Sequence, residues 1–365
     1  MPTSDNQRKV VPANAFSNVV LSGVAKDVPS STPRDIILTG GKPRPNKPFM
    51  LDGYTSRPPK RLPSRLPPPG NMKLHLAIGN KIGRGRVARV FEATVDLDKS
   101  SPELASMALP PLVVKISRRE DAKKLAREAY YYEEMECLQG SVIPRFYGLF
   151  EATIPPEVEF VPWVYDKFNP TTRRYDDSGS ESEEEREDTS DDDSDDDDGG
   201  SFEDDNNDDD KSNADPDGDD DSEDYHSDSD DDDERNRDND PPVVPRPTLV
   251  SILVLERVGG RMPIGQRLPP ALLEELDEMY SDLAKLGVDH VDIRYFNILR
   301  APEPLPDLPS LPSPFTQRTY NWRLVDFDNS FKTNRPLNMW FGYYHCVLDR
   351  LLANLPYGDI YEPWE

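Results

Sequence analysis

The sequence is poor in cysteine and has no long apolar run. Its 365 residues include two cysteines, Cys137 and Cys346, and neither has a second Cys or a His at the spacing of metal ligands. This scarcity argues against a zinc site and against a disulfide framework. The first twenty residues lack the continuous apolar core of a secretion signal, and no stretch approaches eighteen apolar residues. We therefore expect an intracellular protein, cytoplasmic or nuclear, with no membrane contact.

Acidic residues are abundant, but most of them lie in one block. The net charge of the whole chain is −27. Residues 176–240 alone hold 36 Asp or Glu and four Lys or Arg, which is a net charge of −32. The rest of the chain therefore has a net charge of about +5. Because the acidic stretch has almost no apolar residue and its charges repel one another, we predict a disordered insertion over residues 170–247. It is expected to attract basic proteins rather than nucleic acid, and a solubilising spacer without a partner is the alternative.

Proline is also abundant, with 38 residues, and many of these lie near the start of the chain. Residues 1–70 end in YTSRPPKRLPSRLPPPG, and we predict a disordered, proline-rich and basic leader there. The cluster of Lys60, Arg61 and Arg65 resembles a nuclear-import signal, although a basic linker is the commoner explanation. A second proline-rich insertion is predicted over residues 301–319.

The remaining chain has the periods of strands and helices. Apolar residues alternate or run together, as in strands, over 72–83, 86–97, 112–116, 142–153, 157–168 and 248–260. Helical spacing is found over 120–140, 270–287 and 338–355, and the first two end at glycines, Gly140 and Gly287. The sequence therefore predicts an α+β fold whose first strands form an antiparallel sheet.

Six short sequence motifs follow one another along these strands and helices: IGRGRVARVFEA, LVVKI, AREAYYYEEM, ILVLERVGG, HVDIRYFN and VDFD. Together they resemble the protein-kinase-like superfamily, including fungal kinase-like proteins and the aminoglycoside and choline phosphotransferases. The resemblance implies a kinase-like domain over residues 71–365. Such a domain would have two lobes, with an antiparallel sheet in the N-lobe, where the acidic insertion would lie, and a reduced helical C-lobe.

The resemblance also implies which residues bind ATP. Gly83 and Gly85 would let backbone amides come close to the phosphates, with Val90 on the next strand. Lys115 resembles the lysine that neutralises the α and β phosphates, and Glu128 resembles its ion-pair partner. The alternative is that Lys115 is an ordinary exposed lysine without a role in binding. This is disfavoured because Lys115 lies among apolar neighbours, where an unpaired charge is costly.

The later motifs imply a hinge, a base and a metal site. The backbone of Glu256 and Val258, after a gatekeeper at Leu255, would bind adenine. Asp292 would accept the proton of the attacking hydroxyl, and Arg294 would contact the γ-phosphate. Asn297 and Asp326 would hold Mg²⁺, which prefers oxygen ligands. We expect His290 to pack within its loop rather than to carry a proton in the reaction.

Several positions depart from the pattern of the family. Ala88 stands where the third glycine is expected, and Val291 stands where many protein kinases have the arginine that contacts a phosphorylated activation loop. Asp328 replaces a glycine, and only about ten residues separate it from the next predicted helix. Control by activation-loop phosphorylation is therefore not expected, and a peptide-docking platform has little room.

The resemblance favours an ATP- and Mg²⁺-dependent phosphotransferase whose acceptor is a hydroxyl group, with a protein Ser/Thr kinase as the first choice. A small-molecule kinase and a catalytically silent pseudokinase scaffold are the alternatives. An acidic chaperone-like protein would explain the charged block but not the ordered motifs.

Overall fold

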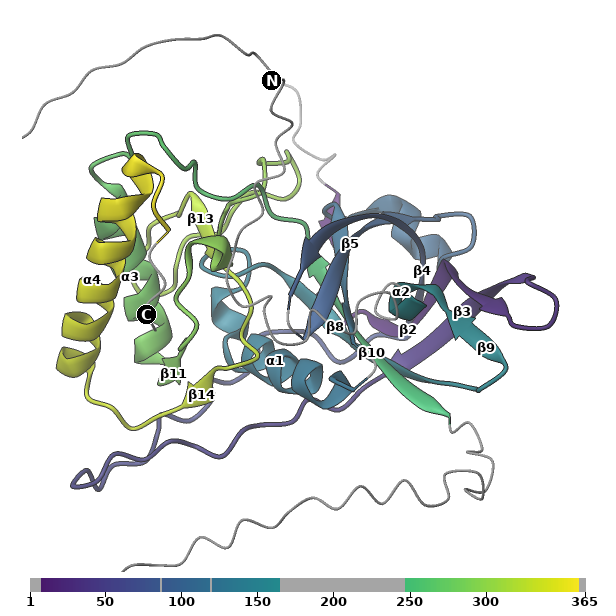
Figure 1. Ribbon diagram of the computed structural model, residues 1–365, viewed down its shortest axis with the longest axis horizontal. Helices are drawn as coiled ribbons and strands as arrows, with labels where there is room; N and C mark the ends of the chain where they lie inside the picture. Colours follow the sequence, from purple (N-terminus) through teal and green to yellow (C-terminus); the bar gives the residue numbers. More distant parts are fainter. Residues whose placement is uncertain (1–7, 86, 119, 165–246, 361–365) are drawn as a thin grey trace, which may run out of the picture. The chain divides into compact units, whose positions relative to one another are not determined.

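The structure is a computed structural model, and it describes residues 8–85, 87–118, 120–164 and 247–360 (Figure 1). The predicted acidic insertion lies outside the described residues, apart from Pro247. Among the residues described, no helix has the length and apolar character needed to cross a membrane.

Seven strands close into a barrel, and an eighth strand extends it. The order around the sheet is β3-β8-β10-β7-β5-β4-β2, and β2 pairs again with β3, so the ring is complete; β9 is added to β2. Neighbours are antiparallel except for β2 and β4, which are parallel. The strands are β2 (Phe16–Asp27), β3 (Pro33–Gly40), β4 (Met72–Arg84), β5 (Ala88–Val95), β7 (Leu112–Ser117), β8 (Phe146–Ile154), β9 (Val158–Phe160) and β10 (Thr248–Glu256).

The prediction of a disordered leader over residues 1–70 is wrong for residues 16–40, which form two strands. β2 and β3 are strands of the barrel, and Val19, Leu21 and Leu38 are fully buried in it. The error arose because the composition was averaged over 70 residues. Most of the prolines and basic residues lie in residues 42–69, whereas residues 16–40 contain enough Val, Ile and Leu to form a buried hairpin.

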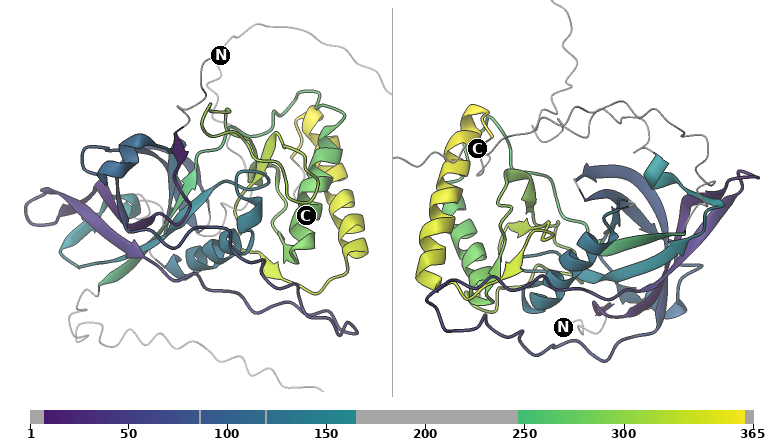
Figure 2. Two further views of the ribbon diagram at one scale, coloured as in Figure 1. Left: turned by 180° about the vertical axis from the view of Figure 1, so that it is seen from behind. Right: turned by 60° about the horizontal axis from the view of Figure 1, so that its bottom comes forward.

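Four helices and several short strands make up the rest of the described chain. The helix α1 (Ala122–Glu134) packs against β8 and β10, and α3 (Leu272–Lys285) lies beside α4 (Leu337–Asn354) (Figure 2). The short elements are α2 (Val161–Val164), β1 (Lys9–Val10), β6 (Met107–Ala108), β11 (Val288–Asp289), β12 (Ile298–Arg300), β13 (Trp322–Leu324), β14 (Phe331–Lys332) and the 3-10 turns 102–106, 136–138, 295–297 and 355–357. After residue 72 most strands and helices lie where the sequence periods predict them, but residues 161–164 of the predicted strand 157–168 form the helix α2.

Two apolar cores share the barrel strands. Alternate residues of a strand point to opposite faces, so Val114 and Ile116 of β7 join the core inside the barrel. Val113 joins the second core, which extends to α1, α3 and α4. Lys115 is two residues after Val113 and therefore lies on the same face of β7. It therefore faces the helices, which is where the candidate site is found.

Candidate functional site

Lys115 is a buried cation held between two carboxylates. Its Nζ lies 2.7 Å from Oε2 of Glu128 on α1 and 2.6 Å from Oδ1 of Asp326, which follows β13. The side chain of Lys115 is 9% exposed and that of Glu128 is 1% exposed, whereas Asp326 is 28% exposed. The structure therefore brings together three predicted site residues that are separated by up to 211 positions in the sequence.

Burial and mutual attraction set the charges of this cluster. Burial raises the pKa of Glu128 to about 7, although the charge of Lys115 opposes the shift. Burial also disfavours the charge on Lys115, but Asp326 and Glu128 outweigh it and hold the Lys115 pKa well above its usual value. Lys115 thus remains a cation that is ready to bind an anion, and Asp326 is the carboxylate that solvent reaches most easily.

The backbone of Asp326 adopts a left-handed conformation, with φ of 67°, which is uncommon for a residue with a side chain. The conformation is held by hydrogen bonds on both sides. His290 Nε2 donates to the Asp326 carbonyl at 3.0 Å, and the Val325 amide donates to the Asn297 carbonyl at 3.0 Å. Such strain persists only where the surroundings impose it, and it is concentrated at functional sites.

His290 connects this segment to a column of aromatic rings. Its ring lies 4.8 Å from that of Phe327, which meets Tyr132 of α1 edge-on at 5.3 Å, and Tyr132 stacks on Phe146 at 5.3 Å. Burial lowers the pKa of His290 below its usual value, so the ring is neutral at neutral pH. This agrees with a packing role, as the sequence predicted.

Asp292, Arg294 and Asn297 form the second half of the site. Arg294 Nε lies 2.7 Å from Oδ1 of Asp292, and Asn297 Nδ2 donates to Oδ2 and to the carbonyl of Asp292 at 3.1 and 3.0 Å. Since both partners of Asn297 are acceptors, the amide nitrogen must face them. The side-chain amide oxygen of Asn297, which is the atom that can bind a cation, is therefore not bonded to Asp292.

The oxygen atoms of Asn297 and Asp326 suit a hard cation such as Mg²⁺. Within the described ranges, no group of three or more His, Cys, Asp or Glu side chains is arranged to hold a metal ion. Two protein ligands fit Mg²⁺ that takes its other ligands from phosphate and water, which is how this ion is commonly bound beside a nucleotide.

Of the two predicted glycines, Gly83 lies near the end of β4 and Gly85 directly follows this strand. Gly83 pairs with Val90, and the Gly85 amide donates to the Ala88 carbonyl at 2.8 Å. A Cβ at either glycine would lie 3.3 Å from this partner strand. Arg118 Nη2 donates to the Gly85 carbonyl at 3.0 Å, which ties the turn to the end of β7. Their role in phosphate binding stays a prediction.

The predicted hinge residues differ in what they contact. Glu256 is buried, its side chain pairs with Arg145 at 2.5 Å, and its amide donates to the Arg145 carbonyl at 2.9 Å. In the part of the chain that the structure describes, the Val258 amide has no hydrogen-bond partner. Of the two predicted hinge residues, Val258 is therefore the one whose N–H suits an external acceptor. The Arg145 partner was missed in the sequence because it lies 111 residues away.

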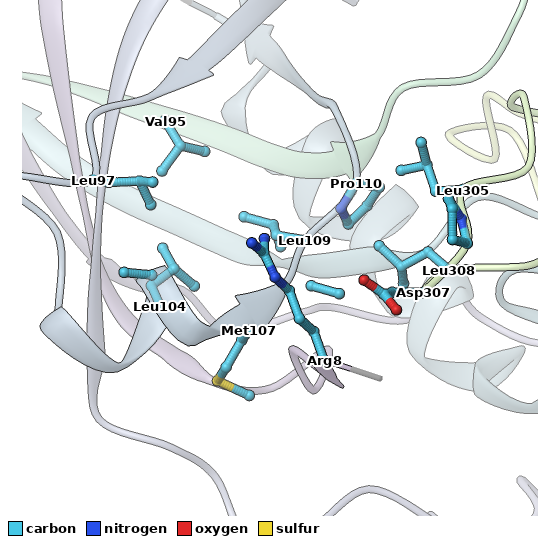
Figure 3. Close-up of a pocket in the computed structure, with 13 residues that line it drawn as sticks. Arg8, Val95, Leu97, Leu104, Met107, Leu109, Pro110, Leu305, Asp307 and Leu308 are labelled. Carbon is cyan, nitrogen blue, oxygen red and sulfur yellow. The ribbon is translucent and has the colours of Figure 1, made fainter. Parts of the chain in front are cut away.

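The cavities shown by the structure lie outside the lysine cluster. A cavity of about 370 Å³ is lined by apolar residues such as Val95, Leu104 and Leu109 and by two charged residues, Arg8 and Asp307 (Figure 3). A second cavity of about 510 Å³ shares Val95 and Leu109 with it and reaches Arg257. Neither contains a predicted site residue, so neither cavity supports the site.

No protein-family model and no curated protein matches this sequence. A comparison with solved structures finds several matches, among them a structure described as "ROP18 kinase domain in complex with AMP-PNP and sucrose". The alignment has 10% identity, covers 90% of this chain and 67% of that chain, and has a TM-score of 0.33. A TM-score this low does not establish that the two proteins share a fold or a function. The function is therefore inferred from the geometry of the site.

Proposed function

We propose that the protein is an ATP- and Mg²⁺-dependent phosphotransferase with a two-lobed, kinase-like domain, and that it transfers the γ-phosphate of ATP to a hydroxyl group of a protein Ser/Thr side chain. The observation that supports this most strongly is the position of Lys115 between Glu128 and Asp326. The bonded pair of Asp292 and Asn297 lies on a loop that His290 connects to Asp326.

The position of each side chain suits one role in phosphoryl transfer. Glu128 keeps Lys115 extended, so that its ammonium can bind phosphate oxygens. Asp292 is held by Asn297 and can orient the acceptor hydroxyl and take its proton, while Arg294 adds a positive charge beside it. Asn297 and Asp326 supply oxygen ligands for the metal. When bound, Mg·ATP supplies the phosphoryl group and a cation that neutralises its developing charge.

Two observations support alternatives. Ser330 and Thr333 are both buried in the short segment after Asp328, which favours a small acceptor over a peptide that docks there. The carboxylate of Asp292 is already paired with Arg294, which favours a silent, nucleotide-binding pseudokinase.

The test is γ-phosphate transfer by the full chain to a protein extract and to a panel of small hydroxylated metabolites, with Asp292→Asn as the control variant. We expect transfer to fall by about 10²–10⁴-fold in Asp292→Asn, because general-base assistance has this size. Mg·ATP affinity should remain near the wild-type value in Asp292→Asn and should weaken in Asp326→Ala.

The outcomes separate the candidates. Transfer to the metabolite panel alone would identify a small-molecule kinase. Binding of Mg·ATP by the wild type without transfer that exceeds the Asp292→Asn level would identify a pseudokinase. Absence of Mg·ATP binding by the wild type would refute the proposal altogether.

A further inference from the structure

An N-terminal strap, residues 41–66, runs from the barrel past α1 and residues 328–334, and it then returns to the end of α1 (Figures 1 and 2). It begins at the edge of the barrel, where the Gly41 amide donates to the Leu149 carbonyl at 2.8 Å. Its sequence is rich in proline, and it contains no strand or helix. Its backbone amides are therefore available for partners elsewhere in the fold.

The strap contacts the helix that carries Glu128. The Arg44 amide donates to the Ala126 carbonyl of α1 at 2.9 Å. Further along, the Arg61 guanidinium lies 3.3 Å from Glu133 and 3.4 Å from Glu136. These ion pairs are partly exposed, so each contributes little stability. The strap thus contacts α1 at Ala126 and again at Glu133, and it also contacts Glu136, just beyond the helix.

The strap also contacts the segment that follows Asp326. The Phe49 amide donates to the Lys332 carbonyl at 2.8 Å, and Phe49 bridges to Thr333 in parallel register. The Leu51 amide donates to Asn334 Oδ1 at 2.8 Å. The rings of Phe49 and Phe331 lie 5.4 Å apart.

Asn46 bonds both elements with one side chain. Its Oδ1 accepts from Arg127 Nη1 on α1 at 3.2 Å, and its Nδ2 donates to the Ser330 carbonyl at 2.9 Å. An arginine can only donate and a carbonyl can only accept, so the orientation of the amide is fixed. Arg127 is adjacent to Glu128, and Ser330 lies four residues after Asp326.

We infer that the strap is a positioning element of the lysine cluster and that Asn46 is its central residue. By joining α1 to residues 328–334, it holds Glu128 and Asp326 together on Lys115. Ser330 and Thr333 are 0% and 1% exposed, so a phosphate could not be added to either residue without moving this segment. The catalytic consequence rests on the proposed function, whereas the positioning itself does not.

The test compares Asn46→Ala with Asn14→Ala in the full chain. Asn14 is a matched control, because its Nδ2 donates to the Pro67 carbonyl at 2.6 Å, and among the described residues its side chain makes no hydrogen bond to α1 or to residues 328–334. Amide hydrogen exchange is measured for peptides that cover α1 and residues 328–334. Loss of a hydrogen bond worth the usual amount should speed exchange about fivefold in both peptides in Asn46→Ala and in neither peptide in Asn14→Ala. Unchanged exchange in α1 would overturn the inference.

A second measurement separates positioning from a general loss of stability. In Asn46→Ala the Kd for Mg·ATP should rise about fivefold, and this effect should disappear when Glu128→Gln is already present, because both changes act on the same ion pair. Independent, additive effects would overturn the inference. If the wild type does not bind Mg·ATP, the proposed function fails, and the exchange comparison alone decides the role of the strap.

Discussion

At the scale of single residues, Lys115 and its two partners carry more negative than positive charge in a buried place. Removal of one partner of such a group leaves the other charge unpaired, which is costly. The cluster is therefore poised between ionisation states, and Glu128 is the member whose proton responds near neutral pH.

The titration of Glu128 gives a testable dependence of stability on pH. Its pKa is about 7 in the folded protein, against an ordinary value of 4.5, so the folded state holds the extra proton between these values. The stability that this group contributes is present below about pH 4.5 and is lost as the pH rises through about 7. Glu128→Gln cannot titrate. Its free energy of unfolding, relative to the wild type, should rise by about 1–3 kcal/mol from pH 4.5 to pH 8.

Urea unfolding of both proteins across this range measures the difference. Other titrating groups, such as Asp289 with its pKa raised by burial to about 6, are common to both proteins and cancel. A difference that does not change with pH would contradict the assignment of the shifted proton to Glu128.

Sequence motifs predicted three residues that the structure brings into contact, Lys115, Glu128 and Asp326, but not how the other candidate residues are held. Lys115, Glu128 and Asp326 could be picked out because each lies in a short motif whose local pattern indicates a strand, a helix or a loop. The partners of Glu256 and Asp289 lie on other elements: Arg145 pairs with the first, and Tyr344 donates to the second at 3.0 Å. No local pattern marks such pairs, because their spacing in the sequence depends on the whole fold.

At the scale of elements, the hairpin of β2 and β3 closes the barrel. β3 pairs with β8 on one side, and β2 pairs in parallel with β4 on the other. The apolar pattern of residues 16–40 could have indicated the strands, but not their partners. A parallel pair between distant segments is not specified by any turn that joins them.

The closure predicts unequal effects for two adjacent residues of β3. Leu38 is fully buried in the barrel, and Ile37 is 64% exposed. Leu38→Ala should lower the free energy of unfolding by about 2–5 kcal/mol, because it leaves a cavity, whereas Ile37→Ala should change it by less than about 0.5 kcal/mol. Chemical denaturation of the two variants measures this. Equal, small effects would mean that the hairpin is not part of the cooperative unit.

At the scale of the whole molecule, charge is separated along the chain. The block 176–240 carries −32, and the remainder carries about +5. The block lies in the connection from β8 to β10, which also contains β9 and α2. Ile154 of β8 pairs with Thr248 of β10, so the two ends of this connection lie side by side. An insertion between two paired strands is compatible with an intact sheet, because a longer loop costs only about 0.6 kcal/mol per doubling of its length. We propose that the block binds basic proteins and is dispensable for the fold.

Replacement of residues 172–244 by a short Gly/Ser linker tests this proposal. The melting temperature and the Mg·ATP affinity should stay near their wild-type values, because β8 and β10 keep their pairing. Capture of a basic probe such as histone by the wild type should be strong at low salt and should weaken as salt is added, since the Debye length falls from about 30 Å at 0.01 M to about 8 Å at 0.15 M. The linker variant should not capture the probe at any salt concentration. Equal capture by both proteins would assign the binding to another surface, and an unfolded linker variant would show that the block is part of the fold.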